Sequence, residues 1–370
     1  MHSDLAQKAL TDGFGRQVHD LRISVTDRCN FRCTYCMPHE DMRWLPRSEI
    51  LTFEEIERVA RVFVEHFGIS TVRLTGGEPT VRAHLPELVA RLAQFPVELS
   101  MTTNGATLDH LALPLKEAGL HRVTVSCDSL RADRFAAITG RDMLAQVLAG
   151  MDAAVRAGLS PVKVNAVLVR GVNDDEVVDL ATFGREHGVE VRFIEFMPLD
   201  GDGQWSLDRV VPAGEIIAQV DGVYPLVPAI SDLATTDLPT TDLATTDLAT
   251  TDLATTDLRS KDGSRRPGRG AEPADRYRYL DGAGHVGVVA SVTRPFCSNC
   301  DRVRLTAEGS LRSCLFAVRE RDLRAVLRGG GTDDDLAEAI TAEVAAKWAG
   351  HAIGKVNFVR PSRSMSQIGG

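Results

Sequence analysis

The sequence predicts an α/β fold, because six short segments rich in β-branched residues alternate with amphipathic segments of helical spacing. In the first amphipathic segment, residues 53–67, apolar side chains such as Ile56, Val59 and Phe63 recur at that spacing. Alternation of this kind produces parallel strands joined by right-handed crossovers, either in a barrel or in an open doubly wound sheet. The expected strands cover residues 21–25, 71–75, 97–101, 122–126, 162–169 and 190–196.

The composition is that of a globular protein, since 44% of the 370 residues are hydrophobic and 25% are charged. The length suits two domains or one α/β barrel with an appendage. The 42 Lys and Arg residues against 51 Asp and Glu residues give a formal charge of −9, which disfavours nucleic acid as a partner. The chain has neither the long apolar run of a membrane span nor a signal peptide, so we expect a cytoplasmic protein.

Four regions follow one another along the chain: an N-terminal segment (1–20), the strand–helix region (21–230), a low-complexity linker (231–276) and a C-terminal region (277–370). The linker contains tandem pentapeptides of the type DLATT over residues 232–258. A pentapeptide β-helix would need more stacked units than these. The repeats hold no aromatic residue and little to bury, so we expect them and the basic stretch after them to be disordered.

Polar and glycine-rich residues gather directly after the expected strands. The second strand is followed by GGEP at residues 76–79, the fourth leads into Ser126 and Asp128, and the sixth leads into Met197. In α/β folds the carboxyl ends of parallel strands carry the functional site. The sequence therefore predicts its site at that edge of the sheet.

Seven cysteines divide into two triplets and a single residue, Cys127, a count that suits disulfides poorly. In a chain without a signal peptide, closely spaced cysteines more often bind a metal or a cluster. Cys127 follows an expected strand, and we interpret it as a small buried hydrophobic residue.

The first triplet, Cys29, Cys33 and Cys36, has CxxxCxxC spacing on a loop after the first strand. Three thiolates on a short loop can hold three corners of a [4Fe–4S] cluster and leave the fourth iron open to a reagent. A structural zinc site is the alternative, but zinc sites usually show paired CxxC or Cys/His knuckles, and none lies nearby in the sequence.

The second triplet, Cys297, Cys300 and Cys314, has CxxC spacing followed by 13 residues and a third cysteine. It again offers three ligands, and a zinc knuckle remains the alternative to a second cluster. Between these cysteines, Arg302 and Arg304 alternate on an expected strand and therefore face the same side. Two guanidinium groups on one face suit a polyphosphate, although a solvated strand face is the other interpretation of such a pair.

The first triplet and the glycine motif together resemble the radical S-adenosylmethionine (SAM) superfamily. The superfamily hallmark is CxxxCxxC with an aromatic residue before the last cysteine, here Tyr35, and its glycine motif matches GGEP at residues 76–79. This resemblance implies that SAM chelates the open iron with Gly77 near its amino group. It also implies that an electron from the cluster cleaves SAM to a 5′-deoxyadenosyl radical.

Over residues 16–370 the chain resembles the GTP 3′,8-cyclase family of radical SAM enzymes. The motifs that carry this resemblance are DLRISVTDRCNFRCTYCMP, RLTGGEP, TTNG, VSCDSL, KVN, IEFMP, FCSNCDRVRLT and a terminal double glycine. The resemblance implies the fold of this family, an incomplete (βα)6 barrel of the TIM type whose open side is closed by a C-terminal region with a second iron–sulfur cluster. It also implies the activity of this family, which is the conversion of GTP to (8S)-3′,8-cyclo-7,8-dihydroguanosine 5′-triphosphate, the first step of molybdenum cofactor biosynthesis.

The resemblance also implies roles for single residues. The six cysteines of the two triplets match ligands of two [4Fe–4S] clusters, of which one binds SAM and the other contacts the guanine base. Arg302, Arg304 and the tail residues Gly369 and Gly370 match positions needed for turnover. The matched SAM contacts are Tyr35, Gly77, Ser126 and Met197. The matched GTP contacts are Arg22, Arg73, Thr102, Lys163, Arg302 and Arg304.

Five of these six GTP positions are cations, which suits a triphosphate inside a protein of negative net charge. Outside these motifs, Met197 would be interpreted as core filling and Lys163 as an exposed residue on a strand.

The mechanism that the family implies has three steps. The adenosyl radical abstracts the 3′ hydrogen of GTP, the ribose radical attacks C8 of guanine, and the resulting aminyl radical is reduced through the C-terminal cluster. The expected partners are GTP, an electron donor such as flavodoxin or ferredoxin, the downstream cyclic pyranopterin monophosphate synthase and a second copy of the chain in a homodimer. Two alternatives remain: a radical SAM enzyme that modifies peptides with an auxiliary cluster, and a non-catalytic iron–sulfur or zinc-binding paralogue.

Overall fold

The computed structural model describes residues 8–200, 203–229, 272–356, 358–361 and 363–369. The described strands form one sheet in the order β12-β11-β10-β1-β2-β3-β4-β5-β6-β9-β8-β7, in which β1 to β6 are parallel and consecutive. The predicted α/β fold with a parallel sheet is confirmed. The six consecutive strands are β1 (Asp20–Ser24), β2 (Thr71–Thr75), β3 (Glu98–Thr103), β4 (Arg122–Ser126), β5 (Lys163–Leu168) and β6 (Glu190–Glu195).

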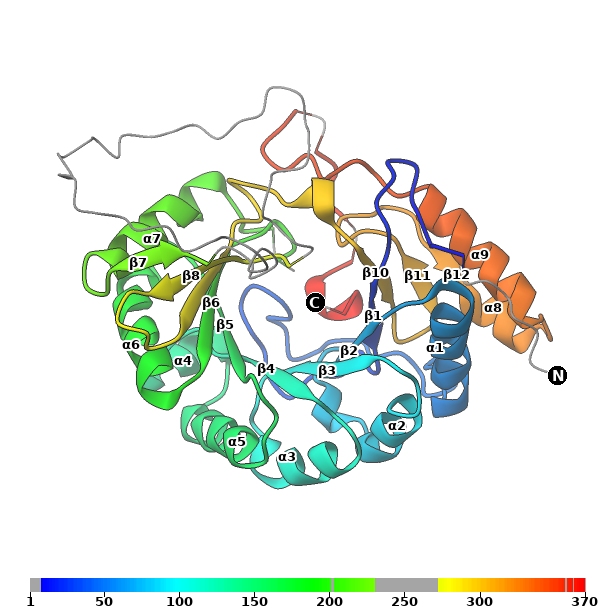
Figure 1. Cartoon of the computed structure of the whole chain (residues 1–370), viewed down its shortest axis with the longest axis horizontal. Coiled ribbons are helices and arrows are strands. Elements are labelled where there is room, and N and C mark those ends of the chain that lie inside the picture. The colour runs from blue at the N-terminus through cyan, green and yellow to red at the C-terminus, as the bar shows by residue number, and fades with distance from the viewer. Residues whose placement is uncertain (1–7, 201–202, 230–271, 357, 362, 370) are drawn as a thin grey trace, which may run out of the picture.

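Helices cover the outer face of this sheet, which curves into the open ring seen in Figure 1. The predicted helix 53–67 has the bounds of α1, because Thr52 and Glu55 form a capping box at its start and Gly68 ends it at φ 68°. The helices that connect the parallel strands are α1 (Phe53–Phe67), α2 (Leu85–Leu92), α3 (Leu108–Glu117), α4 (Ala132–Thr139), α5 (Leu144–Arg156) and α6 (Val177–His187).

Side chains alternate along each strand between an apolar outer face and a polar inner face. In β1, Leu21 and Ile23 are completely buried, whereas Arg22 between them lines the interior of the ring. β4 repeats the pattern, with Val123 buried outside and Thr124 on the interior. A complete barrel of this class fills its interior with apolar layers. In this ring the interior is lined by polar side chains and is not filled by apolar layers, which leaves a cavity for ligands.

The C-terminal region extends the sheet at both ends. β10 (Arg302–Leu305) pairs in parallel with β1, and β9 (His285–Val289) pairs in parallel with β6. These strands cover the edges of the six-stranded core, where backbone groups would otherwise lack partners. β8 begins at Asp275, slightly before the predicted start of the C-terminal region at residue 277. The remaining strands are β7 (Leu226–Pro228), β8 (Asp275–Tyr279), β11 (Ser310–Arg312) and β12 (Arg321–Asp322).

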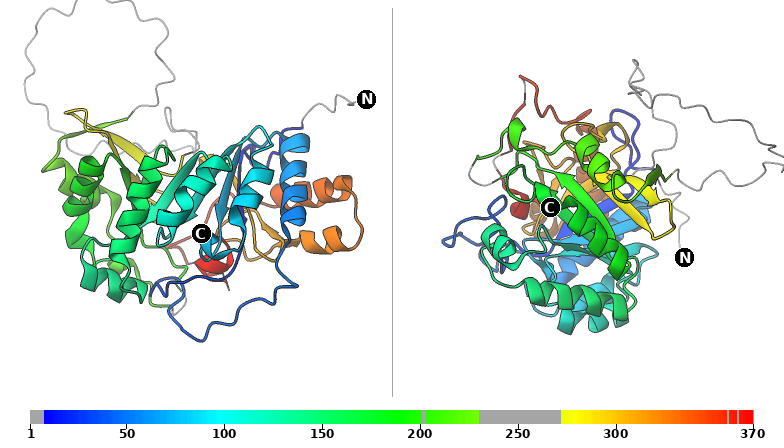
Figure 2. Two further views of the ribbon diagram at one scale, coloured as in Figure 1. Left: turned by 90° about the horizontal axis from the view of Figure 1, so that it is seen from below. Right: turned by 90° about the vertical axis from the view of Figure 1, so that its left-hand side faces the viewer.

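Three further helices of the described residues lie beyond the six strand–helix units. They are α7 (Ala213–Asp221), α8 (Leu323–Arg328) and α9 (Asp333–Ala345). α9 packs against α1 at one end of the ring, as the left view of Figure 2 shows. The short 3-10 turns are η1 (Pro79–Val81), η2 (Asp174–Glu176), η3 (Leu207–Arg209), η4 (Cys297–Asn299) and η5 (Met365–Gln367).

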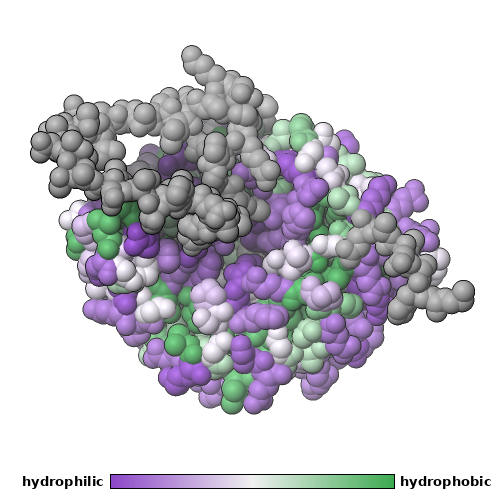
Figure 3. Space-filling view, in the orientation of Figure 1, coloured by the Kyte–Doolittle hydropathy of each residue, from purple (hydrophilic) through white to green (hydrophobic). Residues whose placement is uncertain are grey.

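The DLATT repeats (232–258) and most of the predicted linker lie outside the described residues, so their disorder stays a prediction. Among the helices that the structure describes, none is long and apolar enough to cross a membrane. On the face drawn in Figure 3, hydrophilic residues predominate and hydrophobic residues are scattered among them.

Candidate active site

A cavity of about 510 Å³ occupies the interior of the ring. Every predicted site residue that the structure describes lines it, except Gly369. Residues from both ends of the chain therefore share one space. The predicted residues that line it are Arg22, Cys29, Cys33, Tyr35, Cys36, Arg73, Gly77, Thr102, Ser126, Lys163, Met197, Cys297, Cys300, Arg302, Arg304 and Cys314.

The two cysteine triplets lie at opposite ends of this cavity. β1 and β10 run in parallel, with Asp20 paired to Arg302. The first triplet follows the carboxyl end of β1, whereas Cys300 precedes the amino end of β10. The site therefore spans the length of the strands, and only half of it lies at the carboxyl ends where the sequence predicted it. The other half lies within the ring because the incomplete barrel leaves its interior unfilled.

The first cysteine loop packs closely on the glycine motif. A Cβ on Gly77 would lie 2.4 Å from the backbone oxygen of Arg28, and a Cβ on Gly76, which has φ 155°, would lie 2.6 Å from that of Thr26. Only glycine allows so close an approach. The GGEP motif thus supports the loop that carries the three thiols.

Burial shapes the chemistry of these thiols. It raises the pKa of Cys29 to about 12 and that of Cys36 to about 11, and it raises the pKa of Cys33 well above its usual value. Buried thiols of this kind ionise when a metal replaces the lost solvation of the thiolate. Within the described residues, no three Cys, His, Asp or Glu side chains converge on a site for a single ion. The three thiols share one loop and one cavity wall, which fits the ligation of a [4Fe–4S] cluster.

Asp128, just after β4, holds the aromatic residue of the first loop. Tyr35 Oη donates to Asp128 Oδ2 at 2.5 Å, and the backbone N–H of Val167 donates to Asp128 Oδ1 at 2.8 Å. Burial raises the pKa of Asp128 to about 6, although both hydrogen bonds favour its carboxylate form. Asp128 was expected at this edge of the sheet, after the fourth strand and within the motif VSCDSL, but nothing in the sequence linked it to Tyr35.

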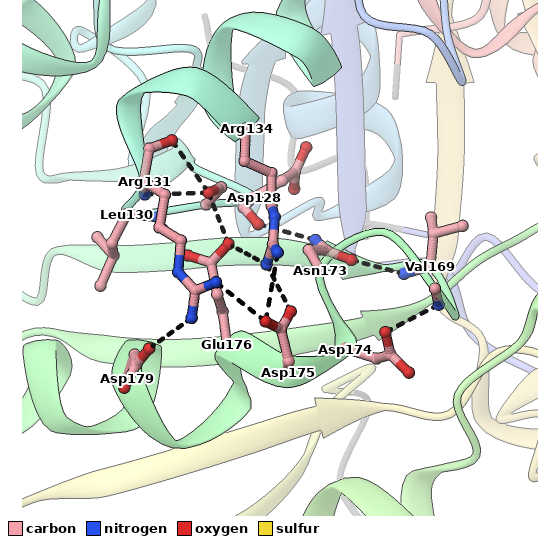
Figure 4. Close-up of polar contacts among 12 residues, drawn as sticks. Asp128, Leu130, Arg131, Arg134, Val169, Asn173, Asp174, Asp175, Glu176 and Asp179 are labelled. Carbon is pink, nitrogen blue, oxygen red and sulfur yellow. Dashed lines mark hydrogen bonds and ion pairs between the residues drawn. The ribbon is translucent and has the colours of Figure 1, made fainter.

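A polar network between the loop after β4 and the segment after β5 holds Asp128 in place, as Figure 4 shows. Asn173 Nδ2 donates to the backbone oxygen of Asp128 at 2.8 Å. Glu176, which is completely buried, accepts from Ser129 Oγ at 2.7 Å and from the backbone N–H of Leu130 at 2.8 Å. Satisfied buried networks make their surroundings rigid. The segment after β5 therefore fixes the loop after β4 and, through Asp128, the Tyr35 side chain.

Cationic side chains line the other half of the cavity. Arg304, Arg22 and Arg73 are neighbours in register across β10, β1 and β2. Adjacent like charges on one sheet face repel each other, and their burial adds a loss of solvation. Arg122 and Arg192, which sequence analysis missed, line the same half. This arrangement is costly unless an anion binds to it.

Arg192 and Lys163 are buried cations with donors available to a ligand. Arg192 is 7% exposed, and its Nε and Nη2 are buried with no hydrogen-bond partner among the described residues. Burial lowers the pKa of Lys163 to about 8, and the charge of Arg192 adds to that effect. The sequence signal for Arg192 was its strand position, two residues after Glu190 on the inner face.

Carboxylates offset part of this positive charge. Asp20 Oδ2 lies 3.4 Å from Arg302 Nε and 3.7 Å from Arg22 Nε. Burial alone would raise the pKa of Asp20, but the arginines around it hold that pKa below its usual value. The lining cations are Arg22, Arg73, Arg122, Lys163, Arg192, Arg302 and Arg304, and the lining carboxylates of this half are Asp20, Glu98, Glu272 and Asp301. Seven cations against four carboxylates leave this half positive.

The second triplet differs from the first in its electrostatic surroundings. Burial raises the pKa of Cys297 and that of Cys314. Burial alone would also raise the pKa of Cys300, but Lys347 and Arg302 hold it below its usual value. The three thiols line one end of the cavity, and this donor set again fits three-cysteine ligation of a cluster.

Comparison with known proteins assigns the family. Residues 23–184 match the family model of the Radical SAM superfamily, and residues 249–353 match that of Molybdenum Cofactor Synthesis C. A Streptomyces coelicolor protein named GTP 3′,8-cyclase is 45% identical over 363 residues, which cover 98% of this chain and 96% of that protein. This chain belongs to the GTP 3′,8-cyclase family.

Two more relatives named GTP 3′,8-cyclase match almost the whole chain. The Mycolicibacterium smegmatis protein is 44% identical over 371 residues, with coverage of 99% of this chain and 93% of that protein. The Corynebacterium glutamicum protein is 41% identical over 374 residues, with coverage of 98% and 90%. As a radical SAM enzyme of this family, the chain uses SAM and a [4Fe–4S] cluster. The predicted family and fold are confirmed.

In this GTP 3′,8-cyclase family member, the C-terminal tail reaches the cavity. Residues of η5 line it, and the red C-terminal turn lies inside the strand ring in Figure 1. The carbonyl oxygen of Gly369 accepts a hydrogen bond from Arg304 Nη1. Gly369 has φ 70°, and a Cβ there would lie 2.6 Å from Thr75 Oγ1, so both backbone and space require glycine. Gly370 lies outside the described residues.

Proposed function

We propose that this chain converts GTP to (8S)-3′,8-cyclo-7,8-dihydroguanosine 5′-triphosphate with SAM and a reductant, the first step of molybdenum cofactor biosynthesis. One observation carries the proposal: a single cavity joins a three-thiol loop of the radical SAM type to a chamber lined by seven cations. The relatives named GTP 3′,8-cyclase support the same activity. In a chain of formal charge −9, such a concentration of positive charge points to a strongly anionic ligand.

We assign GTP to the cationic half of the cavity. The register neighbours Arg304, Arg22 and Arg73 offer guanidinium groups from three adjacent strands, and such groups bind phosphate oxygens in pairs. Lys163 and Arg192 add donors from β5 and β6. The triphosphate would relieve the repulsion among these buried cations. The proposed GTP contacts are Arg22, Arg73, Thr102, Lys163, Arg192, Arg302 and Arg304.

We assign SAM to the half that holds the first cysteine loop. SAM carries a positive sulfonium group, and the charged residues that line this half are the carboxylates Glu78 and Asp128. The opposite charges of the two halves would keep SAM and GTP in their own places. The proposed SAM contacts are Tyr35, Gly77, Ser126 and Met197.

The first cysteine triplet is proposed to hold the SAM-binding cluster, and the second triplet a further [4Fe–4S] cluster. When bound, these clusters supply the electrons for SAM cleavage and for the closing reduction. The protein's own residues orient GTP between the two ends of the cavity and exclude water that would quench radicals.

The tail is proposed to act through the arginines of β10. Gly369 fixes Arg304 through its carbonyl oxygen, and this contact orients the Arg304 guanidinium beside Arg22. Gly370 continues the tail by one residue. We propose that Arg302, Arg304 and both glycines are needed for turnover.

The reaction requires partners outside the chain. A flavodoxin or ferredoxin is the proposed electron donor, because each cycle consumes electrons. The cyclised product is proposed to pass to cyclic pyranopterin monophosphate synthase. We further propose that the enzyme works as a homodimer in the cytoplasm.

The test is anaerobic reconstitution with iron and sulfide, followed by dithionite, SAM and GTP and mass spectrometry of the products. We expect an isomer of GTP to form together with 5′-deoxyadenosine. If 5′-deoxyadenosine forms without a GTP-derived product, GTP is the wrong substrate. If neither forms despite two assembled clusters, the chain is a non-catalytic paralogue. A Cys297→Ser variant should retain SAM cleavage and lose cyclisation, and undiminished cyclised product from it would exclude the role of the second cluster.

A further inference from the structure

Lys347 lies behind the second cysteine triplet, on the turn that follows α9. It is 3% exposed. Its Nζ donates to the backbone oxygens of Cys300 and Arg302, both at 2.9 Å, and lies 3.6 Å from Cys300 Sγ. An ammonium group has three donors and no acceptor, and these three partners use all of them. Lys347 is therefore a buried cation in direct contact with the sulfur of Cys300.

Two contacts connect the turn that carries Lys347 to the loop that carries Cys297 and Cys300. Arg16 Nη1 donates to the backbone oxygen of Cys297 at 2.6 Å and to that of Ala349 at 2.8 Å. A Cβ on Gly350 would lie 2.9 Å from Cys297 Cβ, so the backbone of the turn touches the loop. These contacts hold the Lys347 ammonium at Cys300.

Lys347 differs from the arginines near Cys300 in its access to ligands. Arg302 and Arg304 line the cavity, where a bound anion can neutralise them, whereas Lys347 is not among the lining residues. No carboxylate of the described chain lies within 4.0 Å of Lys347 Nζ. Asp301 is close enough to interact electrostatically with both Lys347 and Cys300, but it forms no ion pair with Lys347. The Lys347 charge therefore acts on Cys300 whether or not substrate is bound, and in a buried setting that interaction is only weakly screened.

We propose that Lys347 is a positioning residue that raises the reduction potential of the second cluster through Cys300. The inference rests on the proposed function, because it requires a cluster on the second triplet. Reduction adds one electron from the external reductant to that cluster. A fixed positive charge and a hydrogen bond at a ligating sulfur stabilise the reduced form, and both are established levers on cluster potentials.

The test is a redox titration, followed by electron paramagnetic resonance, of the full-length protein reconstituted with iron and sulfide. The signal that a Cys300→Ala variant lacks identifies the second cluster. Lys347→Gln removes the charge and keeps N–H donors for the two carbonyls, so the turn stays attached, whereas Lys347→Met removes both. At a fixed solution potential we expect the ratio of reduced to oxidised second cluster to fall about tenfold in Lys347→Gln. This change corresponds to a reduction potential that is lower by about 59 mV for a one-electron couple.

Lys355→Gln is the matched control, because Lys355 is exposed on the same segment and its loss changes the net charge equally. Its second-cluster potential should stay at the wild-type value, and the first cluster should be unchanged in all variants. The inference is overturned if Lys347→Gln leaves the potential unmoved, if Lys355→Gln moves it equally, or if Lys347→Gln simply loses the second cluster. A wild-type protein without a signal that depends on Cys300 would instead overturn the proposed second cluster, which separates the two failures.

Discussion

The two halves of the cavity have opposite charge although the same strands build both. The charged residues that line the half near the first cysteine loop are the carboxylates Glu78 and Asp128, whereas seven cations line the half near the second triplet. A sulfonium cofactor and a triphosphate would each be repelled by the other half. Electrostatics can in this way direct two ligands of opposite charge to different parts of one continuous cavity.

The two triplets also differ at the level of the thiols. Burial raises the pKa of every thiol in the first triplet, whereas Lys347 and Arg302 hold the pKa of Cys300 below its usual value. The same three-cysteine chemistry therefore stands beside lining carboxylates at one end of the cavity and beside lining cations at the other. Changes at the two ends should have separable effects on the reaction.

The largest effect should come from removing one thiol at either end. Cys33→Ser should abolish formation of both 5′-deoxyadenosine and the cyclised product, because the SAM-binding cluster loses a ligand. Cys314→Ser should leave 5′-deoxyadenosine formation in place and abolish the cyclised product alone. Both products are measured by liquid chromatography with mass spectrometry. Equal loss of both products in the two variants would contradict the division of roles between the ends.

Removing one cation should weaken GTP binding and spare SAM. Arg73→Ala should raise the KM for GTP by about 10–100-fold, the equivalent of losing hydrogen bonds to a charged group. The KM for SAM should change by less than about twofold, because Arg73 lies in the other half. Arg131→Ala is the matched control, since Arg131 is a surface residue that pairs with Asp175. A parallel rise in both KM values would show that the halves are not independent.

The pKa of Lys163 predicts a pH dependence that is confined to GTP. Because that pKa is lowered to about 8, the side chain loses its positive charge as the pH rises through 8, and GTP binding should weaken in alkali. The KM for GTP should increase about fivefold between pH 8 and pH 9. Steady-state kinetics in this range provide the measurement. In Lys163→Ala, the KM for GTP should be high and should not depend on pH between pH 8 and pH 9. If this variant keeps the pH dependence of the wild-type enzyme, another group is responsible for the titration.

The Tyr35–Asp128 hydrogen bond should contribute modestly to SAM binding. Asp128→Asn should raise the KM for SAM about fivefold, since a buried hydrogen bond contributes about 1 kcal/mol. Tyr35→Phe removes the same bond, so the double variant should be little worse than either single variant. Fully additive effects would show that the two residues act separately. The KM for GTP serves as the internal control.

The smallest effect should follow deletion of residues 232–256. For a loop of this length the entropy of closure changes only by about 0.6 kcal/mol per doubling, so activity and thermal stability should stay close to wild type. The measurement compares turnover and Tm of the deleted and full-length proteins. A large loss of activity would show that the repeats contribute to the site.

The resemblance to the GTP 3′,8-cyclase family predicted most of the candidate site residues. Spacing by itself indicated the two cysteine triplets, because residues that are close in the chain stay together however it folds. No sequence pattern assigned a role to Arg122, Arg192, Asp128 or Lys347. The role of each depends on a partner that is distant in sequence: a shared inner face of the ring for the arginines, Tyr35 for the aspartate, and a cysteine of the second triplet for the lysine. No short sequence pattern identifies partners that are distant in the chain. The two arginines could have been found, because alternate residues of a strand face the same side of the sheet.

The alternation of strands and helices, the bounds of α1 and the grouping of the cysteines into two triplets can all be predicted from short stretches of the chain, because they depend on neighbours in sequence. The fold itself is needed to show that the two triplets share one cavity and that Arg304, Arg22 and Arg73 are neighbours across three strands. The reason is physical: these relations follow from the pairing of β10 with β1 and from the open, unfilled ring, which long-range packing sets and no short segment of the chain encodes.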